Sequence, residues 1–168
     1  MNKLDLSSYS DKDDQHFMGV ALVLAHRAFS LGETPVGAVI IKNKRIIGTG
    51  FNRVELDHDP TAHAEIVALR KATRNQRDWR LKEATLYVSL EPCIMCAAAL
   101  LNARVRRVVF GAWDNRHGAF GSLFDLSHDP RFNHEIEVKP GLMREKSATL
   151  LREFFRQQRR DAREVEGG

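Results

Sequence analysis

The two cysteines of this chain lie close together in the sequence. Both lie in one segment, Pro92-Cys93-Ile94-Met95-Cys96, and the triplet His63-Ala64-Glu65 precedes them. In a reducing compartment two cysteines at this spacing are more typical of a metal site than of a disulfide. One imidazole and two thiolates leave the fourth tetrahedral position of a zinc ion to water, whereas structural zinc sites usually fill all four. The pattern therefore predicts a catalytic zinc site.

The same pattern gives Glu65 a role. His-x-Glu followed by Pro-Cys-x-x-Cys is typical of zinc-dependent nucleobase deaminases, which replace an exocyclic amine by oxygen. Zinc lowers the pKa of bound water towards about 7. A carboxylate that does not bind the metal can carry the proton to the ring and to the leaving amine. We therefore predict His63, Cys93 and Cys96 as zinc ligands and Glu65 as the proton carrier.

Helix geometry restricts where these residues can lie. Residues two apart on a helix point about 200° apart, so His63 and Glu65 can address one metal only at a helix N-terminus. Thr61 is the predicted N-cap of that helix. Pro92 suits the first position of the next helix, which would place both cysteines on one face near the positive helix end. Two helix starts should therefore converge on one metal.

Two other classes of function compete for these residues. A thioredoxin-like redox pair would use the Cys-x-x-Cys segment but would leave His63 and Glu65 unexplained. A zinc-stabilised RNA-binding module without catalysis would normally want a fourth protein ligand and has no use for Glu65. The joint pattern favours a catalytic zinc site over both alternatives.

A chain of 168 residues is expected to form one domain, residues 1–168, with residues 1–10 as a loose lead-in. Helices and strands alternate, which is typical of an α/β layer structure. Asp11 or Asp13 is the predicted cap of the first helix, and 112–134 is a long loop of the kind that is often functional. The expected helices are 11–31, 61–70, 93–102 and 143–163, and the expected strands are 36–41, 45–51 (a hairpin), 85–90, 106–110 and 136–138.

Composition narrows the setting of the protein. Hydrophobic residues make up 43% of the chain and charged residues 29%, and we see neither an apolar run long enough to cross a bilayer nor a leader segment. We therefore expect a cytoplasmic protein without a membrane partner. A net charge of +4 permits binding to a polyanion without requiring it.

Beyond the metal motif, the chain resembles the bacterial tRNA-specific adenosine deaminases across nearly its whole length. The resemblance implies an α/β, cytidine deaminase-like fold: a three-layer α/β/α arrangement with a mixed five-stranded sheet. It also implies a homodimer, one Zn²⁺ per chain, and conversion of the wobble adenosine of a tRNA anticodon to inosine. The segments that carry it are Pro35-Val36-Gly37-Ala38-Val39, Gly50-Phe51-Asn52-Arg53, His58-Asp59-Pro60-Thr61-Ala62-His63-Ala64-Glu65, Leu90-Glu91-Pro92-Cys93, Val109-Phe110-Gly111-Ala112 and Gly121-Ser122-Leu123.

The resemblance also assigns residues to the substrate. Asn52 would hydrogen-bond the flipped base, and Asp114 would contact the RNA backbone near the target; by themselves they look like a turn amide and a solvated loop acid. The helix 143–163 would grip the anticodon stem-loop, with Phe155 and Arg156 as candidate contacts. Phe154 and Phe155 face different ways on a helix, so at least one is expected to pack in the core, and the other could stack on a base.

Three departures from the family pattern concern RNA binding rather than the reaction. Val54 stands where proline is typical, and Gln157-Gln158 weakens the basic character of the last helix. Trp113 stands where a polar or basic residue is usual, and it could stack on a base or pack beneath the loop. Within the reaction class, a deaminase of free bases or nucleosides shares the metal motif. The basic last helix and the long loop argue against that alternative.

Overall fold

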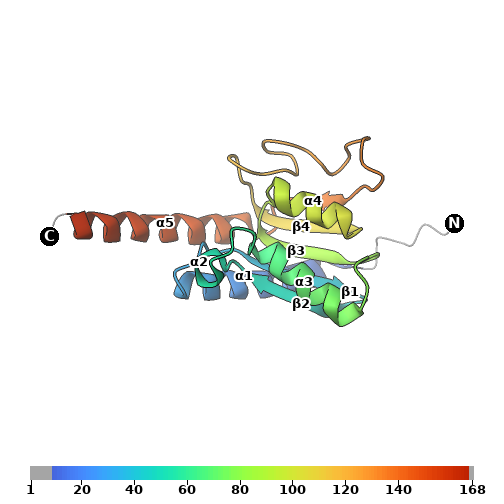
Figure 1. The fold of residues 1–168 in the computed structure, drawn as a ribbon, viewed down its shortest axis with the longest axis horizontal. Helices are drawn as coiled ribbons and strands as arrows, with labels where there is room; N and C mark the ends of the chain where they lie inside the picture. Colours follow the sequence, from blue (N-terminus) through green and yellow to red (C-terminus); the bar gives the residue numbers. More distant parts are fainter. Residues whose placement is uncertain (1–8, 167–168) are drawn as a thin grey trace.

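A mixed five-stranded sheet forms the centre of the computed structural model, which describes residues 9–166 (Figure 1). The strand order is β2-β1-β3-β4-β5. The first pairs, β2–β1 and β1–β3, are antiparallel, whereas β3–β4 and β4–β5 are parallel. This confirms the predicted sheet. The strands are β1 (Gly37–Lys42), β2 (Arg45–Phe51), β3 (Thr85–Leu90), β4 (Arg107–Ala112) and β5 (Glu137–Lys139).

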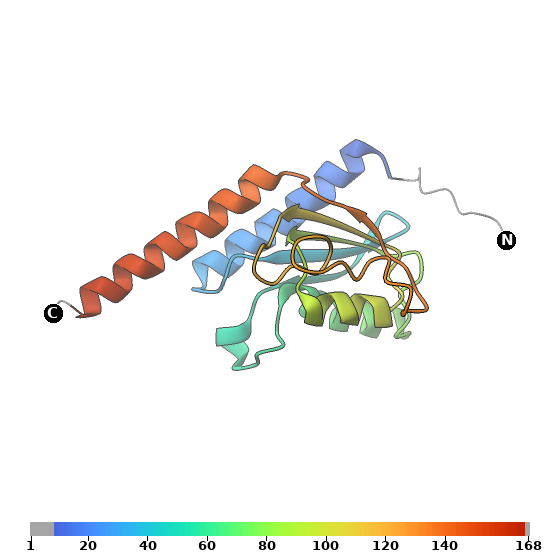
Figure 2. The ribbon, with the colours of Figure 1, turned by 90° about the horizontal axis from the view of Figure 1, so that it is seen from above.

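Helices cover both faces of the sheet and complete three layers (Figure 2). Helices α1 (Asp11–Ser30) and α5 (Arg144–Glu166) lie on one face, and α3 (Ala64–Gln76) and α4 (Ile94–Asn102) lie on the other. Helix α5 is long enough to project beyond the sheet (Figure 1). Among the described residues, no helix combines the length and the apolar character needed to span a membrane. Eight residues of the predicted lead-in, 1–8, lie outside the described part of the chain.

Two local predictions need correction. Helix α1 is capped by Ser10, not by Asp11 or Asp13. The Ser10 hydroxyl accepts a hydrogen bond from the Asp13 N–H, and the Asp13 carboxylate accepts one from the Ser10 N–H, so the two form a capping box. The predicted elements also lack a short helix between β2 and α3, α2 (Val54–Asp57), next to which Arg53 and Asp57 form an ion pair.

Two glycines in β2 bring α3 unusually close to the sheet. A Cβ atom on Gly50 would lie 2.2 Å from the carbonyl oxygen of Ala64, and one on Gly48 would lie 2.4 Å from that of Ala68. Any larger residue at these positions would push the helix outward. The glycines therefore fix where α3 begins, and this end of the helix carries the predicted ligand His63 and the predicted proton carrier Glu65.

A buried ionic cluster ties α1 to the parallel strands. The Asp14 carboxylate is 1% exposed and accepts two hydrogen bonds from Arg107, at 2.9 and 2.8 Å. It also accepts hydrogen bonds from the Tyr87 hydroxyl at 2.6 Å and the Lys139 ammonium at 2.8 Å. Burial by itself would raise the pKa of Asp14, but these hydrogen bonds lower it to about 2. The ionised carboxylate therefore stabilises the folded state.

Replacing Asp14 by asparagine should lower the free energy of unfolding at pH 7 by about 3 kcal/mol, because buried Arg107 would keep only the more distant carboxylate of Glu137, at 3.5 Å. The pKa of Asp14 is about 2 in the folded protein, against an ordinary value of 3.8. The stabilisation is therefore complete above about pH 4 and is lost as the pH falls towards 2. The difference between wild type and variant should shrink over that range in urea titrations.

The matched control is Asp57→Asn, which breaks an equally bidentate but solvent-accessible pair with Arg53. Exposed pairs contribute little, so this change should cost much less. Equal destabilisation by Asp14→Asn and Asp57→Asn at pH 7 would contradict the assignment of Asp14 as a buried stabilising charge.

Candidate active site

Three predicted ligands meet on the α3–α4 side of the sheet. The side chains of His63, Cys93 and Cys96 offer ligand atoms that all lie within 4.8 Å of one another. His63 Nδ1 is 3.6 Å from the Sγ atoms of both cysteines. Zinc bonds of about 2.3 Å to sulfur and about 2.05 Å to nitrogen, at a tetrahedral angle, give an S···N separation of about 3.6 Å. The donor set and its spacing therefore fit one zinc ion.

Each ligand-bearing helix begins at a ligand. His63 is the N-cap of α3 and Cys93 is the N-cap of α4. The predicted caps were therefore wrong: Thr61 lies in a turn, where it donates to Asp59, and Pro92 precedes the helix rather than opening it. Among the described residues, neither His63 nor Cys93 caps its own helix with its side chain. Both side chains are instead free to meet at the metal position.

The predicted proton carrier lies beside these ligands. Glu65 is in the first turn of α3, is 4% exposed and lines the same cavity as His63 and Cys93. Its carboxyl group interacts with the Cys96 thiol. Burial raises the pKa of Glu65 to about 7. Its role as proton carrier stays a prediction.

Contacts among the three ligands shift their pKa values. The hydrogen bond from Cys96 lowers the pKa of the Cys93 thiol to about 4, and the same contact raises the pKa of Cys96. The hydrogen bond with Cys93 raises the pKa of His63. Cys93 is therefore readily available as a thiolate, which is the form that binds a metal. Binding of a metal by both sulfurs releases the proton that Cys96 retains.

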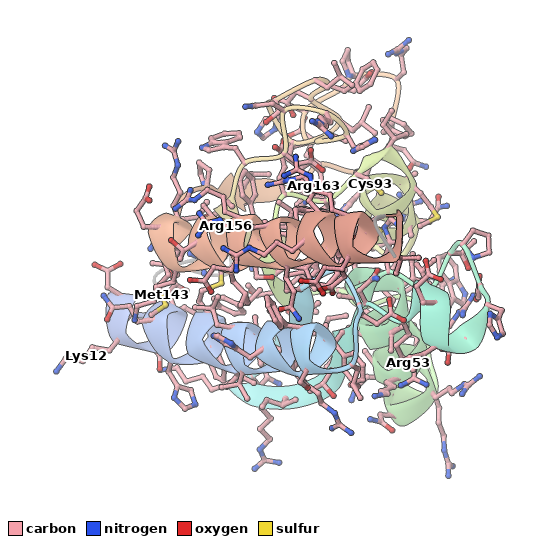
Figure 3. All side chains as sticks on the ribbon, turned by 90° about the vertical axis from the view of Figure 1, so that its left-hand side faces the viewer. Lys12, Arg53, Cys93, Met143, Arg156 and Arg163 are labelled. Carbon is pink, nitrogen blue, oxygen red and sulfur yellow. The ribbon has the colours of Figure 1, made fainter. Side chains whose placement is uncertain are left out.

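A cavity of about 1080 Å³ opens from the metal ligands. His63, Glu65 and Cys93 line it, and so do residues of α5. Figure 3 shows Arg156 on α5, on the side of the molecule where α5 crosses in front of the sheet. The α5 side chains that line the cavity are Leu151, Arg152, Phe154, Phe155, Arg156, Gln158 and Arg159.

Asn52 lies on one wall of this cavity and is held by a residue that the sequence analysis did not identify. The Asn52 amide donates a hydrogen bond of 2.8 Å to Glu33, whose carboxyl group also accepts the Leu56 N–H at 2.7 Å. Glu33 is fully buried. It therefore fixes both the Asn52 amide and the start of the short helix α2. The sequence offered little sign of this, because Glu33 and Asn52 are far apart along the chain.

Asp114 also lines this cavity, from the loop after β4. Its side chain accepts hydrogen bonds from the N–H groups of Arg116 and His117, at 3.0 and 3.2 Å, and so shapes its own turn. Its N–H donates at 2.9 Å to Glu91, a second buried acid that the sequence analysis did not single out. Asp114 is half-buried and lines the cavity, and its contact with RNA stays a prediction.

The aromatic predictions are resolved by packing. Phe154 is buried and packs edge to face against Phe29, whereas Phe155 is 43% exposed at the cavity. Trp113 is half-buried, with its ring 4.9 Å from that of Phe110 in an edge-to-face contact, and it covers Gly121. Of the two alternatives for Trp113, the structure favours packing beneath the loop, although one side still lines the cavity.

Comparison with known proteins agrees with this geometry. Residues 11–112 match the cytidine and deoxycytidylate deaminase zinc-binding region. The tRNA-specific adenosine deaminase of Haemophilus influenzae is 46% identical over 97% of this chain and 94% of its own length.

Two solved structures are also similar. A tRNA:A34 deaminase, studied for A-to-I editing at the wobble position of transfer RNA, is 43% identical with a TM-score of 0.79, covering 81% of this chain and 99% of its own. The guanine deaminase of Bacillus subtilis is 39% identical with a TM-score of 0.58, covering 62% and 66%. With its ligand set intact, the chain therefore belongs to the zinc-binding cytidine and deoxycytidylate deaminase family and, within it, to the tRNA-specific adenosine deaminases.

Proposed function

We propose that this protein hydrolyses the wobble adenosine of a tRNA anticodon to inosine, with one zinc ion held by His63, Cys93 and Cys96. The observation that carries the proposal is the continuity of a single cavity, which joins the metal ligands to the arginines of α5. A nucleobase would reach the metal ligands in this cavity while the RNA backbone follows the arginines of α5. The relatives named for this activity support the same assignment.

The reaction consumes water and releases ammonia, so protons must move from the water to the base and to the leaving amine. Zinc, when bound, makes that water nucleophilic near neutral pH. Glu65 is the proposed carrier of the proton, because its buried carboxyl group lies beside the ligands. Asn52, held by Glu33, is proposed to hydrogen-bond the base. Both side chains are little exposed, Glu65 at 4% and Asn52 at 8%, which limits the access of bulk water to them.

RNA contacts are proposed along α5 and the loop after β4. Arg152, Arg156 and Arg159 recur at helical spacing along the cavity and match the charge of a phosphate backbone. Exposed Phe155 offers a ring on which a base can stack. The Asp114 carboxylate only accepts hydrogen bonds, so its RNA partner must be a donor such as a ribose 2′-hydroxyl. Helix α5 would then be a part of the one deaminase domain that binds RNA, and not a separate domain.

We further propose a homodimer in the cytoplasm, where tRNA would be available. Ile94, Leu123 and Phe124 are large apolar side chains that are 46 to 53% exposed. Their two segments are held together at Gly118. Gly118 pairs with Cys93, the neighbour of Ile94, and its carbonyl oxygen accepts the N–H groups of Leu123 and Phe124. A second copy of the chain would cover such a surface.

Replacing Glu65 by glutamine should reduce turnover by about 10³-fold, because the amide cannot carry the proton. Zinc content and fold should stay unchanged, since Glu65 is not a predicted ligand. Metal analysis, circular dichroism and single-turnover assays measure these effects. Glu83→Gln, an exposed carboxylate outside the cavity, is the control and should behave as wild type. Wild-type turnover by the Glu65 variant would remove the proposed mechanism.

Substrate choice separates the tRNA assignment from a small-molecule deaminase such as the similar guanine deaminase. We expect deamination of an anticodon stem-loop at its wobble adenosine, seen as a mass gain of about one unit on that nucleotide. Free adenosine, cytidine and guanine should react far more slowly, because they cannot reach the arginines of α5. Preferred conversion of a free base or nucleoside would overturn the tRNA assignment while leaving the zinc chemistry intact.

The arginines of α5 allow a separate test of RNA binding. Arg156→Ala should raise the KM for the stem-loop about tenfold and weaken its salt dependence, with kcat nearly unchanged, because a phosphate contact is lost away from the reacting atoms. Arg45→Ala removes one exposed positive charge on β2, outside the cavity, and controls for net charge. Equal effects of the two substitutions would mean that α5 does not contact the RNA.

A further inference from the structure

Glu91 is a buried acid that neither binds the metal nor carries a proton in the proposed mechanism. It is 1% exposed and lies at the end of β3, two residues before the ligand Cys93. Four donors from the loop after β4 converge on its carboxyl group. They are the backbone N–H groups of Asp114 (2.9 Å), Phe120 (3.1 Å) and Ser122 (3.0 Å), and the hydroxyl of Ser122.

The segment 114–122 is therefore folded around one side chain. Asp114 accepts the Gly118 N–H on its carbonyl oxygen at 2.8 Å, which closes the turn. A Cβ atom on Gly118 would lie 2.2 Å from Glu91 Oε2, so the backbone can approach the carboxyl group only because this residue is glycine. Three of the four donors to Glu91 are backbone N–H groups of the loop, so Glu91 fixes the course of the loop backbone and with it this part of the cavity wall.

The same segment is fastened to the metal-binding turn. Gly118 pairs with Cys93 in an isolated β-bridge, and the Ala119 N–H donates to the Pro92 carbonyl at 2.9 Å. Residues 113–117 of this loop line the same cavity as the ligands His63 and Cys93. Glu91 thus lies between the metal ligands and the wall that faces the substrate.

We propose that Glu91 is a positioning residue, which holds the 114–122 segment so that Asp114 and its neighbours form the RNA-facing wall of the cavity. This inference rests on the proposed function. It assigns Glu91 no contact with the reacting atoms. Loss of its carboxyl group should weaken the binding of the RNA more than the chemical step, because the wall and not the metal is displaced.

Glutamine at position 91 tests this arrangement with almost no change of shape. An amide offers one acceptor and one donor group where the loop presents only N–H groups and a hydroxyl. The NH₂ group of the glutamine fits best at the Oε2 position, because there the Ser122 hydroxyl can rotate and accept a hydrogen bond. At the Oε1 position it would face the N–H groups of Phe120 and Ser122, which only donate. The Asp114 N–H would then lose its acceptor.

In the zinc-loaded enzyme, Glu91→Gln should raise the KM for the anticodon stem-loop about tenfold, with kcat changed less than about threefold, while zinc stays at one per chain. Hydrogen exchange without substrate should accelerate at the Asp114 amide. Ser122→Ala removes a single hydrogen bond and should give a milder rise in KM. Ser127→Ala is the matched control, because its hydroxyl donates to Asp125 in the same loop and not to Glu91.

Loss of zinc in parallel with activity would overturn the proposal, since Glu91 would then support the metal site. An unchanged KM in both Glu91→Gln and Ser122→Ala would also overturn it. If Glu91→Gln does not fold, the comparison of Ser122→Ala with Ser127→Ala decides alone. Should the wild type fail to deaminate the stem-loop, the proposed function fails, but the exchange of the Asp114 amide still tests whether Glu91 holds the loop.

Discussion

Two helix N-termini converge on one metal position, and the packing around the site serves this convergence. His63 and Cys93 begin α3 and α4, and the parallel pairing of β3 with β4 brings α4 back onto the face that α3 covers. Gly48 and Gly50 let α3 lie close enough to the sheet for its first turn to reach α4. The ligand distances follow from this packing and not from any flexible segment.

Two buried acids hold the parts of the cavity that would face the substrate. Glu33 holds the Asn52 side of the cavity, and Glu91 holds the Asp114 side. Glu33 accepts the Leu56 N–H of the short helix α2, and Glu91 accepts N–H groups of the loop after β4. The loops that would contact RNA are therefore fixed to the same frame as the ligands, while α5 supplies charge from the opposite layer.

The sequence predicted the sheet, the order of the helices and the three ligands, because periodicity and ligand spacing are local signals. It misplaced both ligand-bearing helix starts for one physical reason. Thr61 and Pro92 are good residues for a helix start, but the structure begins its helices at His63 and Cys93, whose side chains serve the metal site instead of capping. Glu33 and Glu91 could not be found in this way, since their partners lie 19 to 31 residues away.

The coordination of the metal offers the most direct measurement. X-ray absorption at the zinc edge of the purified protein should show two sulfur neighbours at about 2.3 Å and two nitrogen or oxygen neighbours near 2.0 Å, one of them exchangeable. A shell filled by four protein ligands, or a protein that purifies without bound zinc and does not take it up, would contradict a catalytic site built on His63, Cys93 and Cys96.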